Sequence, residues 1–136
     1  MSGGGSKGAY EAGVINGFVN GLDPEDVKYD VVSGVSAGAI NAVFVSLFEK
    51  GEEKQMSEAM LQLFYNMTND HVWTEWGDGI IEDIFNHSGF LDDSPLFNMI
   101  TNIVNKAGSI KRKLVVAADN SIDGSYVLFT ETLPFE

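Results

Sequence analysis

The spacing of apolar residues changes twice within the first fifty positions, and each change predicts a new element. Apolar residues recur at helical spacing over 9–20, which predicts a helix with one side facing a sheet. That side consists of Ala12, Ile15, Phe18 and Val19. A short apolar run predicts a strand over 29–33, and a longer one predicts a buried helix over 37–50. This alternation predicts an α/β domain.

The remainder of the chain is predicted to form further helices and then a pair of strands. An apolar stripe with helical spacing is interpreted as core, and it comprises Met56, Met60, Leu61, Phe64 and Met67. Ser94 is predicted to cap a later helix that has Pro95 at its first position. Residues 114–118 and 126–130 have β character, and the Asp123-Gly124 pair between them favours a hairpin turn.

Composition is that of one globular domain. The 136 residues are 44% hydrophobic, which is enough to build a core. There is no cysteine, so disulfides and thiolate metal sites are excluded and the redox compartment stays open. No signal sequence opens the chain, and its longest apolar stretch, 39–48, is shorter than the roughly 20 residues that span a bilayer. We expect no transmembrane segment, favour the cytoplasm or a peripheral membrane site, and leave the oligomeric state open.

Charge narrows the set of partners. The chain has 20 acidic and 8 basic residues, for a formal net charge of -12. A nucleic-acid backbone or a strongly anionic membrane would be repelled. The one basic cluster, Lys111-Arg112-Lys113, is interpreted as a solvated strand edge. Any lipid contact is therefore expected to use apolar surface.

A candidate nucleophile lies between the first predicted strand and the second helix. The segment Gly34-Val35-Ser36-Ala37-Gly38 has the G-x-S-x-G pattern of a sharp strand-to-helix turn with a serine at its tip. Its two glycines permit the close backbone approach that such a turn requires. The alternative is that Ser36 simply caps the helix, which leaves both glycines unexplained.

A glycine-rich loop at the start of the chain is a candidate for binding an anion. Gly3, Gly4 and Gly5 precede Lys7 and Gly8, and their free amides can point at a developing oxyanion. Gly3-x-Gly5-x-x-Gly8 also fits the dinucleotide-binding pattern. That alternative lacks the acidic residue expected at the end of the second strand, because the predicted strand closes on Ser33-Gly34.

Together these two motifs resemble the patatin-like phospholipase family. The resemblance covers the glycine-rich loop with its Ala9 to Gly13 continuation, and then Asp30 to Ala42, in the family's order and spacing. It continues through Ser94-Pro95-Leu96 and the strand-like Lys113 to Asp119, so it extends over nearly the whole chain. The resemblance implies a patatin-like three-layer α/β/α hydrolase-type domain spanning 1–136.

The resemblance also implies a function. It implies a lipid acyl hydrolase with a Ser-Asp dyad, acting on lipid or phospholipid esters without a metal or organic cofactor. Ser36 would be the nucleophile, and the amides around Gly3, Gly4 and Gly5 would form the oxyanion hole. Lipid degradation would be the process. The alternative is a non-catalytic relative that binds lipid or a protein partner.

The aspartate of the implied dyad is not found in its expected motif. The family places it in Asp-Gly-Gly or Asp-Gly-Ala, and the chain has only Asp78-Gly79 and Asp123-Gly124. The first is interpreted as a helix cap or turn and the second as the hairpin turn, with Asp123 kept as the alternative base. Only Met1 and Ser2 precede the glycine loop, where a first strand is expected. A partial domain is the favoured explanation and a complete inactive relative the alternative.

Two histidines and one aromatic segment have alternative roles. His71 and His87 show no metal-binding spacing, and a Ser-His-Asp triad would need one of them. We expect hydrolysis to survive His87→Ala if a dyad operates. Residues 72–77, which include two tryptophans, are interpreted as a core-facing loop, with an acyl-chain entrance as the alternative.

Overall fold

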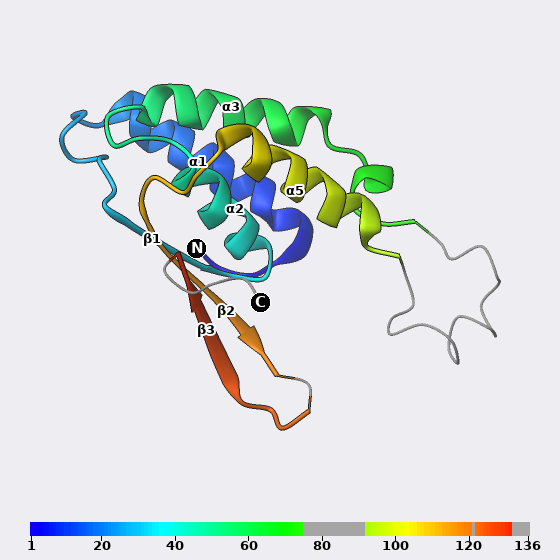
Figure 1. Cartoon of the computed structure of the whole chain (residues 1–136). Coiled ribbons are helices and arrows are strands. Elements are labelled where there is room, and N and C mark those ends of the chain that lie inside the picture. Colours follow the sequence, from blue (N-terminus) through cyan, green and yellow to red (C-terminus); the bar gives the residue numbers. More distant parts are fainter. Residues whose placement is uncertain (75–91, 121, 132–136) are drawn as a thin grey trace.

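Helices lie on one side of a small mixed β-sheet in this protein (Figure 1). The structure is a computed structural model that describes residues 1–74, 92–120 and 122–131. Its helices are α1 (Gly8–Gly21), α2 (Ala37–Ser46), α3 (Glu53–Asn66) and α5 (Ser94–Ala107), with short 3-10 helices η1 (Gly5–Lys7) and η2 (Asn69–His71). Its strands are β1 (Val31–Val35), β2 (Lys113–Asp119) and β3 (Tyr126–Thr130).

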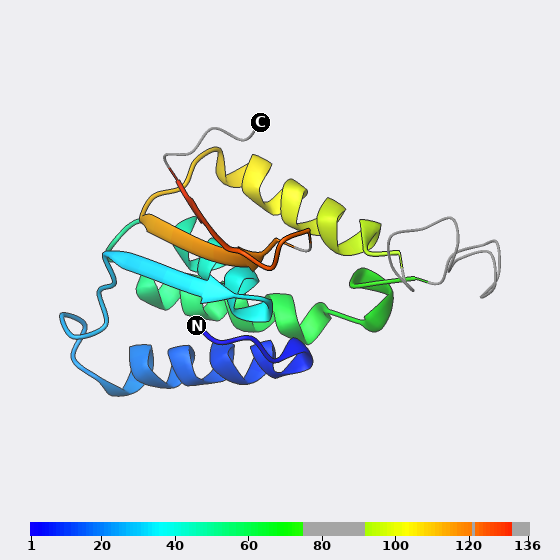
Figure 2. The same ribbon diagram turned by 90° about the horizontal axis from the view of Figure 1, so that it is seen from below.

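The sheet has the order β1-β2-β3. β1 and β2 are parallel, with Val32 opposite Leu114, whereas β2 and β3 form an antiparallel hairpin. The carboxyl ends of β1 and β2 therefore meet at one edge of the sheet, where ligands bind in open α/β sheets. Figure 2 shows α2 behind β1 and β2, with α1 and α5 to either side of the sheet. The predicted α/β class is confirmed. Helices cover one face of the sheet within the described part of the chain.

The core lies between β1, β2 and the first three helices. Its centre is formed by side chains with no exposed surface, namely Ala12, Ala42, Val45, Met56 and Met60. The prediction that the methionine stripe is core is confirmed for Met56 and Met60, against which Leu61 and Phe64 pack, whereas Met67 lies beyond the end of α3 and outside this core. The prediction was wrong for Phe18, which is 49% exposed, because α1 packs mainly against α3 and turns this side chain outward.

Several element boundaries differ from the expectations. β1 lies two residues later than predicted, at Val31–Val35 rather than 29–33, so Gly34 belongs to the strand, and α2 ends at Ser46 rather than at residue 50. α5 begins one residue earlier than predicted, because Asp93 occupies the cap position. The Asp92 carboxylate accepts the Ser94 N–H at 2.9 Å and stabilises that start.

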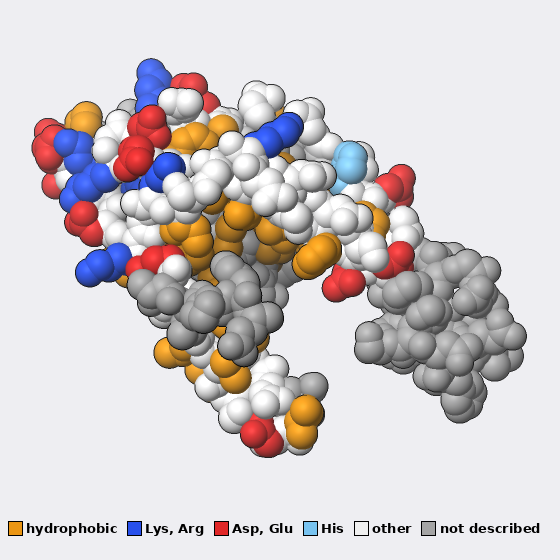
Figure 3. Space-filling model, in the orientation of Figure 1, with side chains coloured by type: hydrophobic (Ala, Val, Ile, Leu, Met, Phe, Trp, Pro, Cys, Tyr) orange, Lys and Arg blue, Asp and Glu red, His pale blue; other side chains and the backbone are white. Residues whose placement is uncertain are grey.

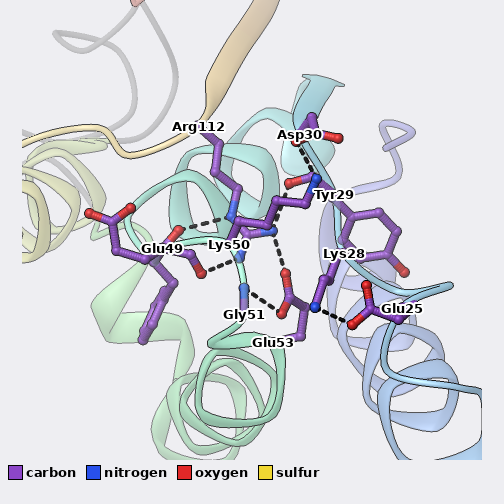
Figure 4. A network of polar contacts seen from close by, with 10 residues as sticks. Glu25, Lys28, Tyr29, Asp30, Glu49, Lys50, Gly51, Glu53 and Arg112 are labelled. Atoms are coloured by element: carbon purple, nitrogen blue, oxygen red, sulfur yellow. Dashed lines mark hydrogen bonds and ion pairs between the residues drawn. The ribbon is translucent and has the colours of Figure 1, made fainter.

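The basic cluster is not wholly solvated, so that prediction was wrong for its central residue. Arg112 is only 5% exposed and donates to three carbonyl oxygens, those of Tyr29, Phe48 and Glu49, at 2.8–2.9 Å. Its Nη1 also lies 3.0 Å from Oε1 of buried Glu53 (Figure 4). The backbone carbonyls at the end of α2 and before β1 lack helical or sheet partners, and the guanidinium supplies five donors to satisfy such groups.

The first residue of the chain lies along the free edge of β1. The Met1 amino group donates to the Ser33 carbonyl at 2.7 Å, and the Val35 N–H donates to the Met1 carbonyl at 3.3 Å. Met1 thus bonds to two alternate residues of β1, Ser33 and Val35, which is the hydrogen-bond pattern of parallel strands. The glycine loop is therefore fixed to the sheet immediately before it begins.

Candidate active site

Ser36 occupies a strained backbone conformation between β1 and α2. Its φ is 55° and its ψ is -129°, and no other non-glycine residue of the described chain has a positive φ. Such a conformation costs about 1–3 kcal/mol and is concentrated at functional sites. Ser36 is exposed and stands at the cap position of α2, yet its side chain makes no capping hydrogen bond. The simple helix-cap interpretation therefore does not explain this residue.

The two glycines of the serine motif are required by close backbone contacts. A Cβ atom on Gly34 would lie 2.1 Å from the Gly38 carbonyl oxygen, and one on Gly38 would lie 2.5 Å from the Ser2 carbonyl oxygen. Gly34 therefore allows β1 to turn directly into α2. Gly38 allows the segment that enters the glycine loop to cross the first turn of α2.

The glycine-rich loop lies directly beside Ser36. A Cβ atom on Gly3 would be 3.0 Å from the Ser36 Cβ and 3.6 Å from its Oγ. Gly5 has a φ of 58°, which glycine adopts without strain. Within the described residues, the N–H groups of Gly3, Gly4 and Gly5 donate to no protein acceptor. The loop thus presents free backbone donors next to the candidate nucleophile.

The next two residues of the motif connect this loop to α1. The Lys7 N–H donates to the Gly4 carbonyl at 3.2 Å, which closes the 3-10 turn. Gly8 begins α1, and a Cβ atom there would make only an ordinary 3.5 Å contact with the Ala37 Cβ. The loop is therefore held between α1 and the first turn of α2.

The first turn of α2 adds a favourable field at Ser36. Ser36 stands at the amino end of this ten-residue helix, where the aligned peptide dipoles act as roughly half a positive charge. Negative charge that develops beside the serine would be stabilised there. The free glycine amides and the helix end are thus both suited to binding an anion.

Asp123 lies in the β2–β3 turn, as its Asp-Gly context predicts. Its Oδ1 accepts the Ser125 N–H at 2.9 Å, and Gly124 has a φ of 72°. Hydrogen bonds from the hydroxyl and N–H of Ser125 lower the pKa of the exposed Asp123 carboxyl. A lower pKa weakens the carboxylate as a base. No described carboxylate or imidazole forms a hydrogen bond with Ser36 Oγ.

His71 has a local structural role in η2. Its Nδ1 accepts the Thr68 N–H at 3.1 Å, and the Thr68 side chain accepts the His71 backbone N–H, so the two residues form a capping box. His87 and Asp78 lie outside the described residues, as does the second half of the aromatic segment 72–77. The part of that segment within the described chain includes Trp73, which is 37% exposed.

The described residues contain neither a metal-binding cluster nor a membrane-spanning helix. They hold no group of three or more His, Cys, Asp or Glu side chains placed to bind a metal ion. None of their helices has the length and apolar character needed to cross a bilayer. A crevice between α2, α3 and α5 is apolar but has a cavity volume of only about 20 Å³, which is about the room needed for one water molecule.

Two side chains near the site escaped the sequence-based interpretation. Asn41 of α2 is 1% exposed, and its amide donates to Glu11 Oε2 at 3.0 Å and to the Gly8 carbonyl at 3.1 Å. Glu11 Oε1 accepts the Ser2 N–H at 2.7 Å. The signal that could have revealed them is a polar residue, Asn41, inside an otherwise apolar helix. The sequence alone does not identify its partner.

Comparison with known proteins identifies the family. A family model described as patatin-like phospholipase matches residues 1–121, which include the glycine loop, Ser36 and both parallel strands. No curated protein and no solved structure gave a significant match to the chain. The matched region covers most of the 136 residues. The chain therefore belongs to the patatin-like phospholipase family.

Proposed function

We propose that this protein hydrolyses fatty acyl esters with Ser36 as the nucleophile. Ser36 Oγ attacks the ester carbonyl carbon, and its proton passes to a general base. The tetrahedral oxyanion accepts hydrogen bonds from the glycine-loop amides, and its collapse releases the alcohol and leaves an acyl-serine. Water then adds to the acyl carbon and releases the fatty acid and the free serine. The observation that carries this proposal is the strained, uncapped Ser36 beside free glycine amides.

The general base is proposed to be an aspartate, which makes the pair a Ser-Asp dyad. A serine hydroxyl is a weak nucleophile unless an adjacent base removes its proton. Membership of the patatin-like family supports this assignment, since the resemblance implies an aspartate in that role. Asp123 stays the alternative base, although its hydrogen bonds to Ser125 favour a turn role.

The proposed substrate is a lipid or phospholipid whose acyl ester reaches Ser36 at the membrane surface. Charged side chains gather at the end of the molecule where α1 leads into β1, whereas apolar side chains are visible on the hairpin (Figure 3). The exposed apolar residues there are Ile122, Tyr126, Leu128 and Phe129. Contact through apolar surface is compatible with a net charge of -12, and lipid degradation would be the process.

Ester hydrolysis by the full-length protein and its Ser36→Ala variant tests the proposal. Release of fatty acid from phospholipid and short-chain esters is expected for the unmodified protein and should be lost in the variant, while circular dichroism stays unchanged. Turnover that persists undiminished in folded Ser36→Ala would refute the proposal.

A binding function without catalysis is the second candidate. It is favoured by one observation, namely that Ser36 Oγ has no hydrogen-bonded base within the described residues. Lipid vesicles that bind the full-length protein without any hydrolysis would select this candidate. Hydrolysis that depends on Ser36 would exclude it.

A further inference from the structure

We infer that Glu11 and Asn41 act as positioning residues that hold the glycine loop against Ser36; this inference rests on the proposed function. Glu11 lies in the first turn of α1, and Asn41 lies one turn into α2. The loop and Ser36 belong to different elements, so their separation depends on how α1 and α2 meet. The two side chains form the polar contact at that meeting point.

This pair makes three hydrogen bonds that join α1, α2 and the segment before the glycine loop. Asn41 Nδ2 divides its two donors between Glu11 Oε2, at 3.0 Å, and the Gly8 carbonyl, at 3.1 Å. Glu11 Oε1 accepts the Ser2 N–H at 2.7 Å, so each carboxylate oxygen has one partner. Hydrogen bonds to an ionised carboxylate are shorter and stronger than neutral ones. The carboxylate therefore connects α2 to the backbone residue that precedes Gly3.

Ser2 is held from two directions. Its N–H donates to Glu11. Its carbonyl oxygen packs against Gly38, so closely that a Cβ atom on Gly38 would be only 2.5 Å from it. Gly3, the next residue, lies against Ser36. A change in the position of Ser2 would therefore move the free amides relative to the serine. Misplacement by about 1 Å can lower a reaction rate about 100-fold.

The burial of Asn41 also favours a positioning role over general packing. An apolar residue would suit the interior of α2, whose other buried side chains are mostly small and apolar. A buried amide is costly unless it is fully hydrogen-bonded, and here its donors are satisfied only by Glu11 and Gly8. Both acceptors belong to the first turn of α1, which directly follows the glycine loop.

The test compares Glu11→Ala and Glu11→Gln with a matched control on the same helix. Asn16→Ala removes the Asn16 Nδ2 to Ser57 Oγ hydrogen bond of 3.1 Å, which joins α1 to α3 away from Ser36. Glu11 is only half-buried, so its variants should fold, and circular dichroism checks this. Glu11→Gln keeps one acceptor and should give an intermediate result.

Amide hydrogen exchange on the full-length protein measures how firmly the loop is held and requires no substrate. Loop exchange is followed at the two protected amides that fix the segment entering the loop, the Ser2 N–H on Glu11 and the Val35 N–H on the Met1 carbonyl. Exchange of both should rise about tenfold or more in Glu11→Ala and stay unchanged in Asn16→Ala. Labelling by a fluorophosphonate should slow about 10- to 100-fold, with kcat for a soluble ester reduced and KM nearly unchanged. Asn16→Ala should lower only the thermal midpoint.

Unchanged loop exchange in Glu11→Ala would overturn the inference. Faster exchange with unchanged kcat and labelling would overturn it as well, since the loop would then move without consequence. A failure of the proposed function itself would be recognised by a different result, namely hydrolysis that persists in Ser36→Ala. In that case loop exchange still decides whether Glu11 and Asn41 hold the loop.

Discussion

The backbone at Ser36 adopts a φ of 55°, although a serine side chain makes this conformation costly. Neither a capping bond nor any other described hydrogen bond of the side chain compensates for that cost. What maintains the conformation is the surrounding backbone, which Gly34 and Gly38 allow to approach closely. At the scale of the residue, the strain places the hydroxyl at an exposed turn beside the glycine amides.

This strain predicts a difference between two variants that both lack the hydroxyl. Ser36→Gly should be more stable than Ser36→Ala by about 1 kcal/mol, because glycine adopts a positive φ without steric cost. Urea unfolding of both variants measures the difference. Equal stability would show that the backbone at Ser36 is not strained.

At the scale of elements, the junction of β1 with α2 depends on the segment that precedes the glycine loop. Met1 forms two hydrogen bonds with β1, and the Ser2 carbonyl lies against Gly38. The nucleophile turn and the loop are therefore one packed unit, although they lie far apart in the sequence, at 34–38 and 3–5. Substitutions at this contact should affect both.

Two glycine-to-alanine variants distinguish the effect of a close backbone contact on stability from the effect of helix propensity. Gly38→Ala should cost about 1–3 kcal/mol of unfolding free energy, because its Cβ would overlap the backbone of Met1 and Ser2. The Cβ atom of Gly13→Ala in α1 would meet no neighbouring atom, so this variant should gain about 0.5–1 kcal/mol of unfolding free energy from the better helix propensity of alanine. Urea unfolding of both variants gives the comparison. A Gly38→Ala variant as stable as the parent would contradict the contact described here.

The buried Arg112 is predicted to hold α2, β1 and β2 together. Arg112→Met should lower the free energy of unfolding by about 3–5 kcal/mol, since it leaves Glu53 buried without its ion-pair partner. Arg112→Met combined with Glu53→Gln should cost less than Arg112→Met alone. Lys111→Met, at an exposed neighbouring position, should change stability by no more than about 0.5 kcal/mol. A small loss in Arg112→Met, similar to that of the Lys111 variant, would argue against this role.

The elements were predictable from the sequence where local pattern decides them. β3 and the hairpin turn follow from β-rich runs around Asp123-Gly124, and α1 and the methionine stripe follow from helical spacing. The burial of Arg112 was not predictable, because its carbonyl partners lie more than 60 residues away. The same holds for the Glu11–Asn41 contact, which depends on how two helices meet.

At the scale of the whole molecule, acidic groups dominate, and several are stabilised by their neighbours. A hydrogen bond from the Leu114 N–H lowers the pKa of Glu131, and a hydrogen bond from Lys50 lowers the pKa of Asp30. A folded-state pKa below the unfolded value adds stability that is present above the unfolded pKa. That stability is lost as the pH falls through the folded value.

These pKa shifts predict destabilisation by acid. The unfolded values are 4.5 for Glu131 and 3.8 for Asp30, so the thermal midpoint should fall as the pH drops below about 4.5. Glu131→Gln should remove part of this dependence, while Glu58→Gln, at an exposed helical position, serves as the control. Thermal unfolding from pH 7 to pH 3 makes the measurement. Identical pH profiles for Glu131→Gln and the parent would contradict the prediction.

Peptide mapping of the full-length protein after reaction with a fluorophosphonate tests whether Ser36 is the nucleophile. We expect one phosphonyl adduct, on Ser36, which is absent from Ser36→Ala and retained in Asp123→Asn. An adduct on another residue, or hydrolysis of lipid esters without any adduct on Ser36, would contradict this expectation.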